Sequence, residues 1–259
     1  MNLLDGIVEQ KRVEILKRKQ KRPLSDLATF SYYRRVCNVI SLPGIAEKPG
    51  IIAEFKRKSP SRGPINMEAD PVNVAAAYEA AGVAAMSILT DRNFFGGSFL
   101  DLKQVRDFSP GLVLLRKDFI IDPYQLHEAS AYGADMILLI AAILDRREIE
   151  ELALEATSLG LSILLEVHKE EELEKYHPEI KYVGVNNRDL KTFQVDRDRG
   201  LELIGKMPPG VVPVSESGLS SRHDISILSE AGYLLFLMGE TFMKEKDPGL
   251  ACRKLIECL

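Results

Sequence analysis

The chain has 259 residues, of which 46% are hydrophobic and 28% charged, and its formal net charge is −4. This balance is typical of a globular protein with enough apolar material for a core. The small negative charge excludes a chain-wide basic field for binding nucleic acid. Three cysteines, Cys37, Cys252 and Cys258, are too few and too widely spaced for a disulfide framework or a zinc site.

Nothing in the sequence suggests export or a membrane span. The longest apolar runs are far shorter than a bilayer requires, and Met1–Arg22 has neither the apolar centre nor the cleavage site of a signal peptide. Free cysteines fit a reducing compartment. We therefore expect a cytoplasmic protein that binds neither membrane nor nucleic acid.

The first 48 residues differ from the rest of the chain. Apolar residues at roughly helical spacing predict an amphipathic helix from about Asn2, a candidate N-cap, to Gln20. Its second half is basic, which is more typical of a solvated face than of a membrane or nucleic-acid site. Replacing Arg18 and Lys19 with glutamate should therefore scarcely change turnover. A second helix is predicted at Ser31–Ile40, before two Pro-Gly pairs break the chain. The apolar positions are Leu3, Leu4, Ile7, Val8, Ile15 and Leu16, and the basic ones are Lys11, Arg12, Lys17, Arg18, Lys19, Lys21 and Arg22.

From residue 51 onward, short apolar runs alternate with amphipathic, charge-rich segments. The pattern predicts strands at 51–55, 84–89, 112–116, 136–141, 161–167, 182–185, 211–215 and 234–238. It predicts helices at 71–81, 99–107, 123–132, 145–159, 169–175, 199–206, 220–231 and 248–258.

Eight strand–helix units imply right-handed crossovers and a parallel sheet. The simplest solution is one α/β domain over residues 1–259, a (β/α)8 TIM barrel with residues 1–48 as an N-terminal helical extension. The alternative is an open doubly wound sheet, which commonly has a glycine-rich turn after its first strand, whereas the turn here has one glycine. Pro213 lies inside the seventh strand, so we expect irregularity there.

The first strand ends in charged residues that share one face. Because strand residues alternate, Glu54 and Lys56 point to the same side. Burying them is costly unless that side opens into a polar pocket for an anionic ligand. The alternative is a salt-bridged strand end at the surface.

Polar residues also follow the other strands, and barrel active sites form at these carboxyl ends. Glu166 could be structural if Lys117 or Lys56 paired with it, the asparagines could be turn residues, and the phenylalanines could belong to the core. The loops after strands seven and eight are the usual phosphate site of a barrel. The candidates are Glu54, Lys56, Ser59, Phe95, Lys117, Phe119, Glu166, Asn186, Arg188, Glu216, Ser217, Gly218 and Gly239.

Six motifs in order along the barrel resemble the indole-3-glycerol phosphate synthase family of tryptophan biosynthesis. They are IAEFKRKSPS at 52–61, LRKDFI at 115–120, LLEVH at 164–168, VNNRDL at 185–190, SESGL at 215–219 and LMGE at 237–240. The extension resembles that of the family as well. In two places the chain departs from it: Asn187 and Glu240 stand where some members carry serine. At the latter turn only the backbone N–H of Gly239 is carried over as a phosphate contact.

The resemblance implies that 1-(2-carboxyphenylamino)-1-deoxyribulose 5-phosphate closes to an indole with loss of CO2 and water, without metal or cofactor. It implies Lys117 as the principal acid, Glu166 as a base or second acid, and Lys56 as a later acid or an anion contact. Further catalytic residues are Glu54 and Asn186, and the substrate-binding residues are Ser59, Phe95, Phe119, Arg188, Glu216, Ser217, Gly218 and Gly239.

Within this set, Phe95 and Phe119 would sandwich the anthranilate ring. Asn186 and Arg188 would orient its carboxylate or the developing hydroxyl, and Ser217, Gly218 and Gly239 would hold the phosphate. The resemblance also suggests that the extension packs across the open, C-terminal end of the barrel. We expect a monomer and leave open an association with other enzymes of the tryptophan pathway.

A sister phosphate barrel, phosphoribosylanthranilate isomerase, is a second candidate. That enzyme expects an acid–base pair of Cys and Asp and has no long extension. Cys37 precedes the first strand here and is poorly placed for that role. A third possibility, from a different class, is a nucleic-acid- or membrane-binding module that uses the basic part of the first helix.

Overall fold

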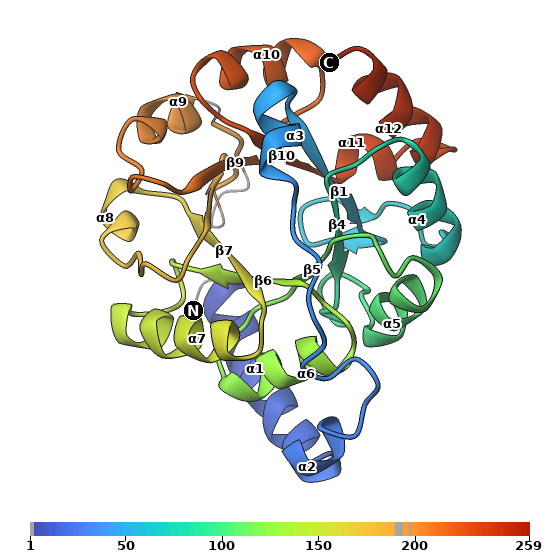
Figure 1. Ribbon diagram of the computed structural model, residues 1–259, viewed down its shortest axis with the longest axis vertical. Coiled ribbons are helices and arrows are strands. Elements are labelled where there is room, and N and C mark those ends of the chain that lie inside the picture. Colours follow the sequence, from blue (N-terminus) through green and yellow to red (C-terminus); the bar gives the residue numbers. More distant parts are fainter. Residues whose placement is uncertain (1–2, 190–193, 197) are drawn as a thin grey trace.

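The chain folds into a closed barrel of eight parallel strands surrounded by helices (Figure 1). The computed structural model describes residues 3–189, 194–196 and 198–259; the predicted cap Asn2 and Leu190, which ends the fourth motif, lie outside them. Around the barrel the strands follow the order β1, β10, β9, β8, β7, β6, β5, β4. This closure confirms the predicted (β/α)8 barrel and excludes the open sheet. The strands are β1 (Gly50–Phe55), β4 (Ala85–Leu89), β5 (Leu114–Lys117), β6 (Met136–Ile140), β7 (Ser162–Val167), β8 (Tyr182–Asn186), β9 (Val212–Glu216) and β10 (Leu235–Met238).

Every helix predicted between the strands is present, with its ends shifted by up to two residues. An antiparallel pair of two-residue strands, β2 (Lys58–Ser59) and β3 (Gly63–Pro64), was not predicted. None of the described helices is both long and apolar enough to cross a bilayer. The helices are α4 (Pro71–Ala80), α5 (Phe99–Phe108), α6 (Pro123–Ala131), α7 (Arg146–Ser158), α8 (Glu170–Leu173), α9 (Asp198–Ile204), α10 (Arg222–Glu230), α11 (Glu240–Met243) and α12 (Pro248–Glu257).

The alternation of side chains along each strand separates the apolar core from the polar residues inside the barrel. On β1, Ile51, Ala53 and Phe55 point outward into the apolar layer beneath the helices. Glu54 has the opposite parity and faces the barrel interior, and Lys56 follows on that same side. The same alternation turns the last residues of β5, β8 and β9 inward, and on β7 the last but one, Glu166. The barrel therefore holds these polar groups at one end.

Pro213 does not disturb β9, and the expected irregularity is wrong. Its carbonyl accepts a hydrogen bond from the Leu234 N–H at 3.2 Å, and it pairs in register with Val183 of β8. A residue in a parallel strand points its N–H and C=O to the same neighbour. The missing N–H of Pro213 therefore faces β10 just before that strand begins, where no ladder bond is lost.

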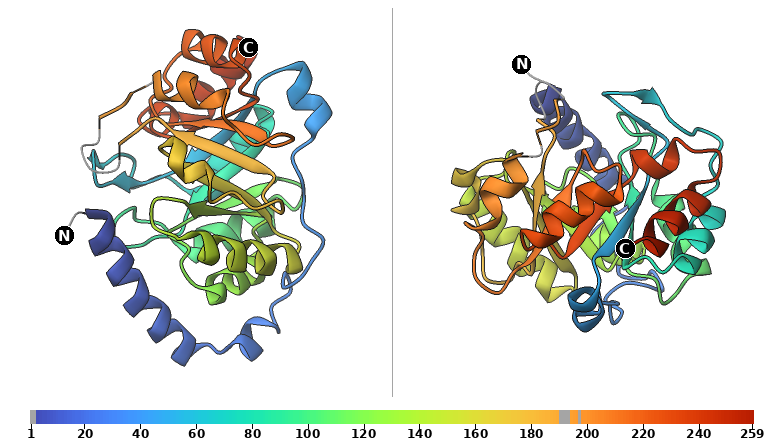
Figure 2. Two further views of the ribbon diagram at one scale, coloured as in Figure 1. Left: turned by 90° about the vertical axis from the view of Figure 1, so that its left-hand side faces the viewer. Right: turned by 90° about the horizontal axis from the view of Figure 1, so that it is seen from above.

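The described part of the extension, residues 3–48, lies against both ends of the barrel and not only the C-terminal end. Helix α1 (Leu3–Lys21) lies across the C-terminal end, and Ile7 joins an interior apolar cluster with Phe119 (Figure 2). The chain then runs along the outside to the opposite end, where Ile40 and Ile45 join the same cluster. A Cβ on Gly50 would lie 2.7 Å from Ile45 Cγ2, so the start of β1 packs directly against Ile45 of the extension.

Two predictions within the extension are wrong. Ser31–Ile40 forms turns and irregular chain that is bound to Asp135, the residue before β6. Asp135 Oδ1 accepts the backbone N–H of Asn38 at 2.7 Å, so this donor is not available to a helix, and the same carboxylate pairs with the Arg35 guanidinium. Helix formation instead occurs in the segment expected to break the chain, where proline in the first turn is tolerated. The short helices are α2 (Leu24–Leu27) and α3 (Leu42–Glu47).

The basic half of α1 is not a solvated face throughout. Arg12 and Lys17 are exposed as predicted, but Lys11 is buried. Arg18 Nε lies 2.9 Å from Glu128 Oε1 on α6, and Glu128 is only 3% exposed. The prediction that reversing Arg18 and Lys19 scarcely changes turnover assumed that both side chains are solvated, and this premise is wrong for Arg18.

We expect Arg18→Glu to destabilise the protein by about 2 kcal/mol, because it would bring a carboxylate beside the buried Glu128. Urea denaturation measures the change in free energy of unfolding. Lys17→Glu, one residue earlier on the exposed side of the helix, is the matched control. Equal midpoints for the two variants would contradict this account of the docking.

Candidate active site

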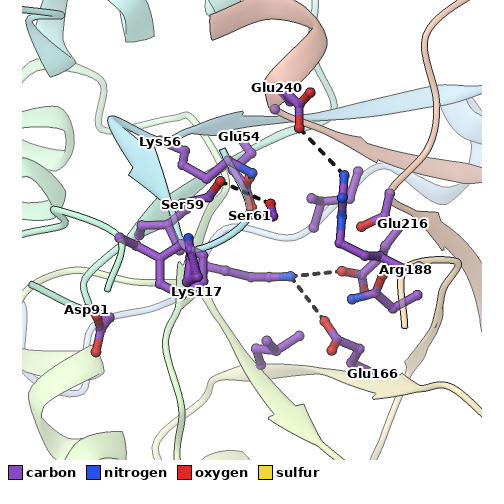
Figure 3. Close-up of a pocket in the computed structure, with 18 of the residues that line it drawn as sticks. Glu54, Lys56, Ser59, Ser61, Asp91, Lys117, Glu166, Arg188, Glu216 and Glu240 are labelled. Atoms are coloured by element: carbon purple, nitrogen blue, oxygen red, sulfur yellow. Dashed lines mark hydrogen bonds and ion pairs between the residues drawn. The ribbon is translucent and has the colours of Figure 1, made fainter. Parts of the chain in front are cut away.

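One pocket opens at the C-terminal end of the barrel, and every residue predicted from the strand ends lines it (Figure 3). This placement excludes the alternative that these are salt-bridged strand ends at the surface, since Glu54 is 5% exposed and Glu166 is 3% exposed. The pocket wall contains Glu54, Lys56, Ser59, Phe95, Lys117, Phe119, Glu166, Asn186, Arg188, Glu216, Ser217, Gly218 and Gly239.

At the pocket floor Lys117 reaches from β5 across the barrel between two carboxylates. Its Nζ lies 2.9 Å from Glu216 Oε2 and 3.2 Å from Glu166 Oε2. The Lys117 side chain is 13% exposed, so solvent or a ligand can reach the ammonium group. The cation that a buried Glu166 requires is therefore Lys117.

The three groups shift one another's proton affinity. Burial lowers the pKa of Lys117, but Glu216, Glu166 and Glu54 outweigh it and raise the pKa above its usual value. Burial raises the pKa of Glu216 to about 7, because Lys117 offsets it only in part. For Glu166 burial acts in the same direction, yet Lys117 and His168 prevail and lower the pKa. The site thus holds a charged ammonium, an ionised Glu166 and a Glu216 that titrates near neutrality.

The pKa of Glu216 makes folding stability depend on pH. Its pKa rises from 4.5 to about 7 on folding, so between these values the folded chain binds more protons than the unfolded chain. Stability from this group is therefore fully present below about pH 4.5 and is lost as the pH rises toward 7. We expect Glu216→Gln to flatten this part of the stability profile. Urea titrations of both proteins between about pH 5 and pH 8 measure it, and parallel profiles would contradict the assignment.

A second ion pair lies higher in the pocket. Lys56 Nζ is 2.6 Å from Glu54 Oε1, and the Lys56 side chain is 16% exposed. Gly239 lies against this pair: a Cβ there would come within 2.5 Å of Glu54 Oε1, so only glycine leaves room for the carboxylate. The close approach explains why this turn carries no side chain.

The side-chain amide of Asn186 connects Glu166 at the pocket floor with Arg188 at the pocket mouth. Its Oδ1 accepts the backbone N–H of Arg188 at 3.0 Å, and its side chain also hydrogen-bonds Glu166. Arg188 extends to Glu240, with 3.5 Å between Nη2 and Oε2, and Glu240 also pairs with Arg62 at 2.9 Å. The carboxylate of Glu240 is thus bound by two guanidinium groups at the pocket mouth.

The two aromatic side chains form one wall. The rings of Phe95 and Phe119 have centroids 6.0 Å apart and planes inclined by 39°. A third ring stacked between them would need them about 7 Å apart, with parallel faces. The geometry described here offers an aromatic ligand a continuous apolar surface and not the slot expected from the sequence.

The turn expected to hold the phosphate follows β9, which lies opposite β5 in the barrel. Ser217 has a φ of 66° and Gly218 a φ of 74°, so two consecutive residues adopt the left-handed conformation. This conformation is costly for serine and is found most often at functional sites. The turn sets the backbone at the pocket wall, directly after Glu216.

Several pocket residues escaped the sequence analysis. The apolar side chains of Leu3, Leu4 and Ile7 come from α1. The extension was expected to pack across this end of the barrel, but these three residues were not named as part of the pocket. Asp91 and Asp118 also line the wall. The carboxylate of Asp118, the residue after Lys117, points toward Lys11 and Arg116.

His168 lies just outside the pocket lining. It is 8% exposed, and its Nε2 is 3.6 Å from Glu166 Oε1. Burial lowers its pKa, but Glu172 and Glu166 raise it above the usual value. Over the described ranges, no group of three or more His, Cys, Asp and Glu side chains has a metal-binding arrangement.

Solved structures share this fold at low sequence identity. A 3-hexulose-6-phosphate synthase from Salmonella typhimurium superposes with a TM-score of 0.65 at 12% identity, covering 80% of this chain and 97% of its own. A tryptophan synthase alpha subunit from Legionella pneumophila gives a TM-score of 0.58 at 11% identity, covering 82% and 92%. The barrel and the acid–base groups gathered at its C-terminal end define an enzyme of the (β/α)8-barrel class.

Sequence comparison narrows the class to a family. The family model described as indole-3-glycerol phosphate synthase matches residues 4–255. A protein of that name from Bacteroides thetaiotaomicron is 42% identical over 258 residues, covering 100% of this chain and 99% of its own. Another, from Salinibacter ruber, is 43% identical over 258 residues, covering 98% and 95%. The chain belongs to the indole-3-glycerol phosphate synthase family.

Proposed function

We propose that this chain closes the pyrrole ring of 1-(2-carboxyphenylamino)-1-deoxyribulose 5-phosphate, releasing CO2 and water to give indole-3-glycerol phosphate. The observation that carries the proposal is the group of three charged side chains at the pocket floor. The ammonium of Lys117 lies between two carboxylates there, and the pKa of Glu166 is lowered whereas that of Glu216 is raised. Ring closure followed by loss of water needs both an acid and a base, and this group of side chains supplies them within one pocket.

The first step joins an aromatic carbon to the ketone carbon. As that bond forms, the ketone oxygen gains negative charge, and Lys117 is the group proposed to donate a proton to it. Its raised pKa does not prevent the transfer, because a full alkoxide is about as basic as hydroxide and so a stronger base than an amine. CO2 then leaves with its bonding electrons returned to the ring, which restores aromaticity.

The remaining steps remove the new hydroxyl and one proton. The hydroxyl needs a second acid, a role proposed for Lys56, which lies beside Glu54 and is open to the pocket. The proton needs a base, and the lowered pKa of Glu166 keeps that carboxylate ionised for the task. Together these transfers balance the loss of one water molecule.

The substrate is proposed to lie across the pocket floor. Its aromatic ring would pack on the wall of Phe95 and Phe119 beside β4 and β5, and its phosphate would reach the Ser217–Gly218 turn and Gly239 beside β9 and β10. Of these strands, β5 and β9 lie opposite each other in the barrel. Lys117, which spans the same direction, would then meet the reacting ketone between the two ends.

The remaining substrate contacts are proposed from position in the pocket. Asn186 and Arg188 would orient the carboxylate or the new hydroxyl. Ser59, whose Oγ lies 3.3 Å from Ser61 Oγ, and Glu216 would complete the wall. We further propose that the protein acts as a single-domain monomer in the cytoplasm, where Cys37, Cys252 and Cys258 would stay reduced.

A turnover assay with the purified protein tests the proposal. We expect the ultraviolet absorbance of an indole to appear as the substrate is consumed, with one CO2 released per indole formed. Failure of a folded preparation to convert this substrate would refute it. Conversion of phosphoribosylanthranilate in its place would favour the sister isomerase.

A further inference from the structure

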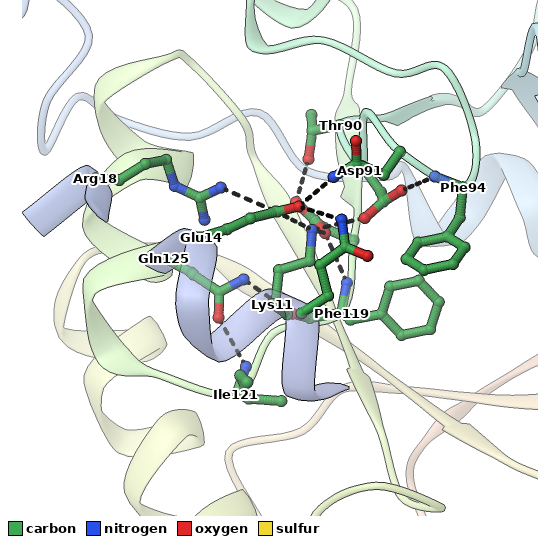
Figure 4. Close-up of polar contacts among 12 residues, drawn as sticks. Lys11, Glu14, Arg18, Thr90, Asp91, Phe94, Phe119, Ile121 and Gln125 are labelled. Atoms are coloured by element: carbon green, nitrogen blue, oxygen red, sulfur yellow. Dashed lines mark hydrogen bonds and ion pairs between the residues drawn. The ribbon is translucent and has the colours of Figure 1, made fainter. Parts of the chain in front are cut away.

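A buried ammonium group lies where α1 meets the barrel, and no step of the proposed reaction uses it (Figure 4). Lys11 Nζ is 2.7 Å from Asp91 Oδ2, 3.0 Å from Asp118 Oδ1 and 3.1 Å from Glu14 Oε2. The side chain of Lys11 is 2% exposed, and those of the two aspartates are 1% exposed. We call these four residues the Lys11 cluster.

The cluster ties three separate segments together. Lys11 and Glu14 belong to α1, Asp91 to the loop after β4, and Asp118 to the loop after β5. Burial lowers the pKa of Lys11, but the aspartates raise it above its usual value; the pKa of Asp118, which burial raises, is held low by Lys11 and Arg116. Lys11 and Asp118 are therefore both charged at neutral pH, and an ion pair this deeply buried is lost only at high cost.

Asp91 organises the loop that carries one of the aromatic side chains of the pocket. Its Oδ1 accepts the N–H of Phe94 at 2.7 Å, and its carbonyl accepts the N–H of Gly97 at 2.7 Å. These two bonds bracket Phe95. Among the described residues, Asp91 has no ion-pair partner besides Lys11, so the placement of this carboxylate depends on α1.

Asp118 organises the other aromatic side chain. Its Oδ1, the atom that faces Lys11, also accepts the N–H of Phe119 at 2.9 Å. Its Oδ2 accepts from Thr90 Oγ1 at 2.7 Å and from Arg116 at 2.9 Å. Asp118 directly follows Lys117 in the chain, so a shift here would also move the end of β5.

We infer that Lys11 is a positioning residue for the aromatic ring of the substrate. Its ammonium holds the two aspartates, and through their hydrogen bonds it fixes the wall formed by Phe95 and Phe119, whose rings are in contact. The extension thereby contributes a charge that shapes the pocket in addition to covering it. This inference rests on the proposed function, because it concerns how that substrate is held.

Replacement of Lys11 by methionine, which keeps the length of the side chain and removes the charge, tests the inference. At a temperature well below the midpoint of thermal unfolding, we expect KM to rise about tenfold, with a smaller fall in kcat. Lys17→Met, an exposed lysine on the same helix, is the control and should match the wild type. A role confined to stability would lower the unfolding midpoint and leave both constants of the folded enzyme unchanged.

A double-mutant cycle with Asp91→Asn tests whether Lys11 acts on KM through its ion pair with Asp91. Asparagine retains an oxygen for the Phe94 N–H but loses the charge that pairs with Lys11. If the ion pair is what positions the wall, the double variant should have about the same KM as Lys11→Met alone. If the effects of the two substitutions on KM multiply, the inference is overturned, because Lys11 and Asp91 would then act separately.

Glu14→Gln keeps the test decisive if Lys11→Met fails to fold. Glu14 accepts hydrogen bonds from Lys11 and from Asn93 in the loop after β4, and it does not line the pocket. A rise in KM would support the coupling without any direct contact with substrate, and an unchanged KM would overturn it. Absence of turnover in the wild type would instead refute the proposed function, so the two failures are distinguishable.

Discussion

Replacing Lys117 with methionine is expected to lower kcat by about 10²–10⁴-fold and to leave the barrel folded. The ammonium lies between Glu166 and Glu216 at the pocket floor, where the ketone oxygen is proposed to become negatively charged. Methionine fills the same space but offers neither proton nor charge. The lost rate therefore measures what the acid contributes to the transition state.

Glu166 and Glu216, which lose their shared cation in the Lys117→Met variant, could affect its folding. Without the ammonium they would repel each other, and Glu216, whose pKa is already about 7, would take up a proton. Neutralisation avoids a buried pair of like charges, so circular dichroism should match the wild type. Lys254→Met, an exposed lysine on α12, is the control for purification and handling. Turnover of Lys117→Met at the rate of that control would show that another group is the acid.

The barrel itself was predictable because its signal is local. Each buried strand of a parallel barrel is a short apolar run, and each helix shows an apolar stripe, so the rhythm of the sequence reports the fold directly. Pro213 was misjudged because the cost of a proline depends on which neighbour its nitrogen faces. That direction follows from the register between β9 and β10, which a single sequence does not specify.

The site was predictable for a different reason. Parallel strands bring their carboxyl ends to one face, so residues as far apart as Glu54 and Glu216 could be assigned to one pocket without any distance. The signs of their pKa shifts could not be assigned, since Lys117 interacts with three carboxylates while burial opposes them. Only the geometry decides which effect is larger.

The contacts of the extension were the least predictable. Lys11 resembles its exposed neighbours Arg12 and Lys17 in the sequence, and nothing local marks it as buried. Its partners Asp91 and Asp118 are 80 and 107 residues further along the chain. A lysine within an apolar stripe is the signal that could have been read, because Ile7, Lys11 and Ile15 lie on one helical face.

Substitution of Glu166 by glutamine is the other change with a large expected effect. We expect kcat to fall by about 10²–10³-fold, because an amide has the size of the carboxylate but cannot accept the proton that aromatisation releases. The carboxyl pKa is lowered by Lys117 and His168 in spite of burial, so the wild-type group is ionised and ready as a base at neutral pH. Glutamine can still accept a hydrogen bond from Lys117, which limits disturbance of the floor.

The pH dependence separates a base from a structural group. If Glu166 is the base, the acidic limb of the kcat profile reports its protonation and should be absent from the glutamine variant. Removing this charge should also lower the pKa of Glu216, since Glu166 helps to raise it, and the variant should therefore lose less stability as the pH rises toward 7. Glu171→Gln, on the exposed side of α8, controls for the loss of one negative charge. A glutamine variant with wild-type kcat and an unchanged acidic limb would mean that the proton goes to another group. Glu54, which lines the same pocket and helps to raise the pKa of Lys117, is an alternative.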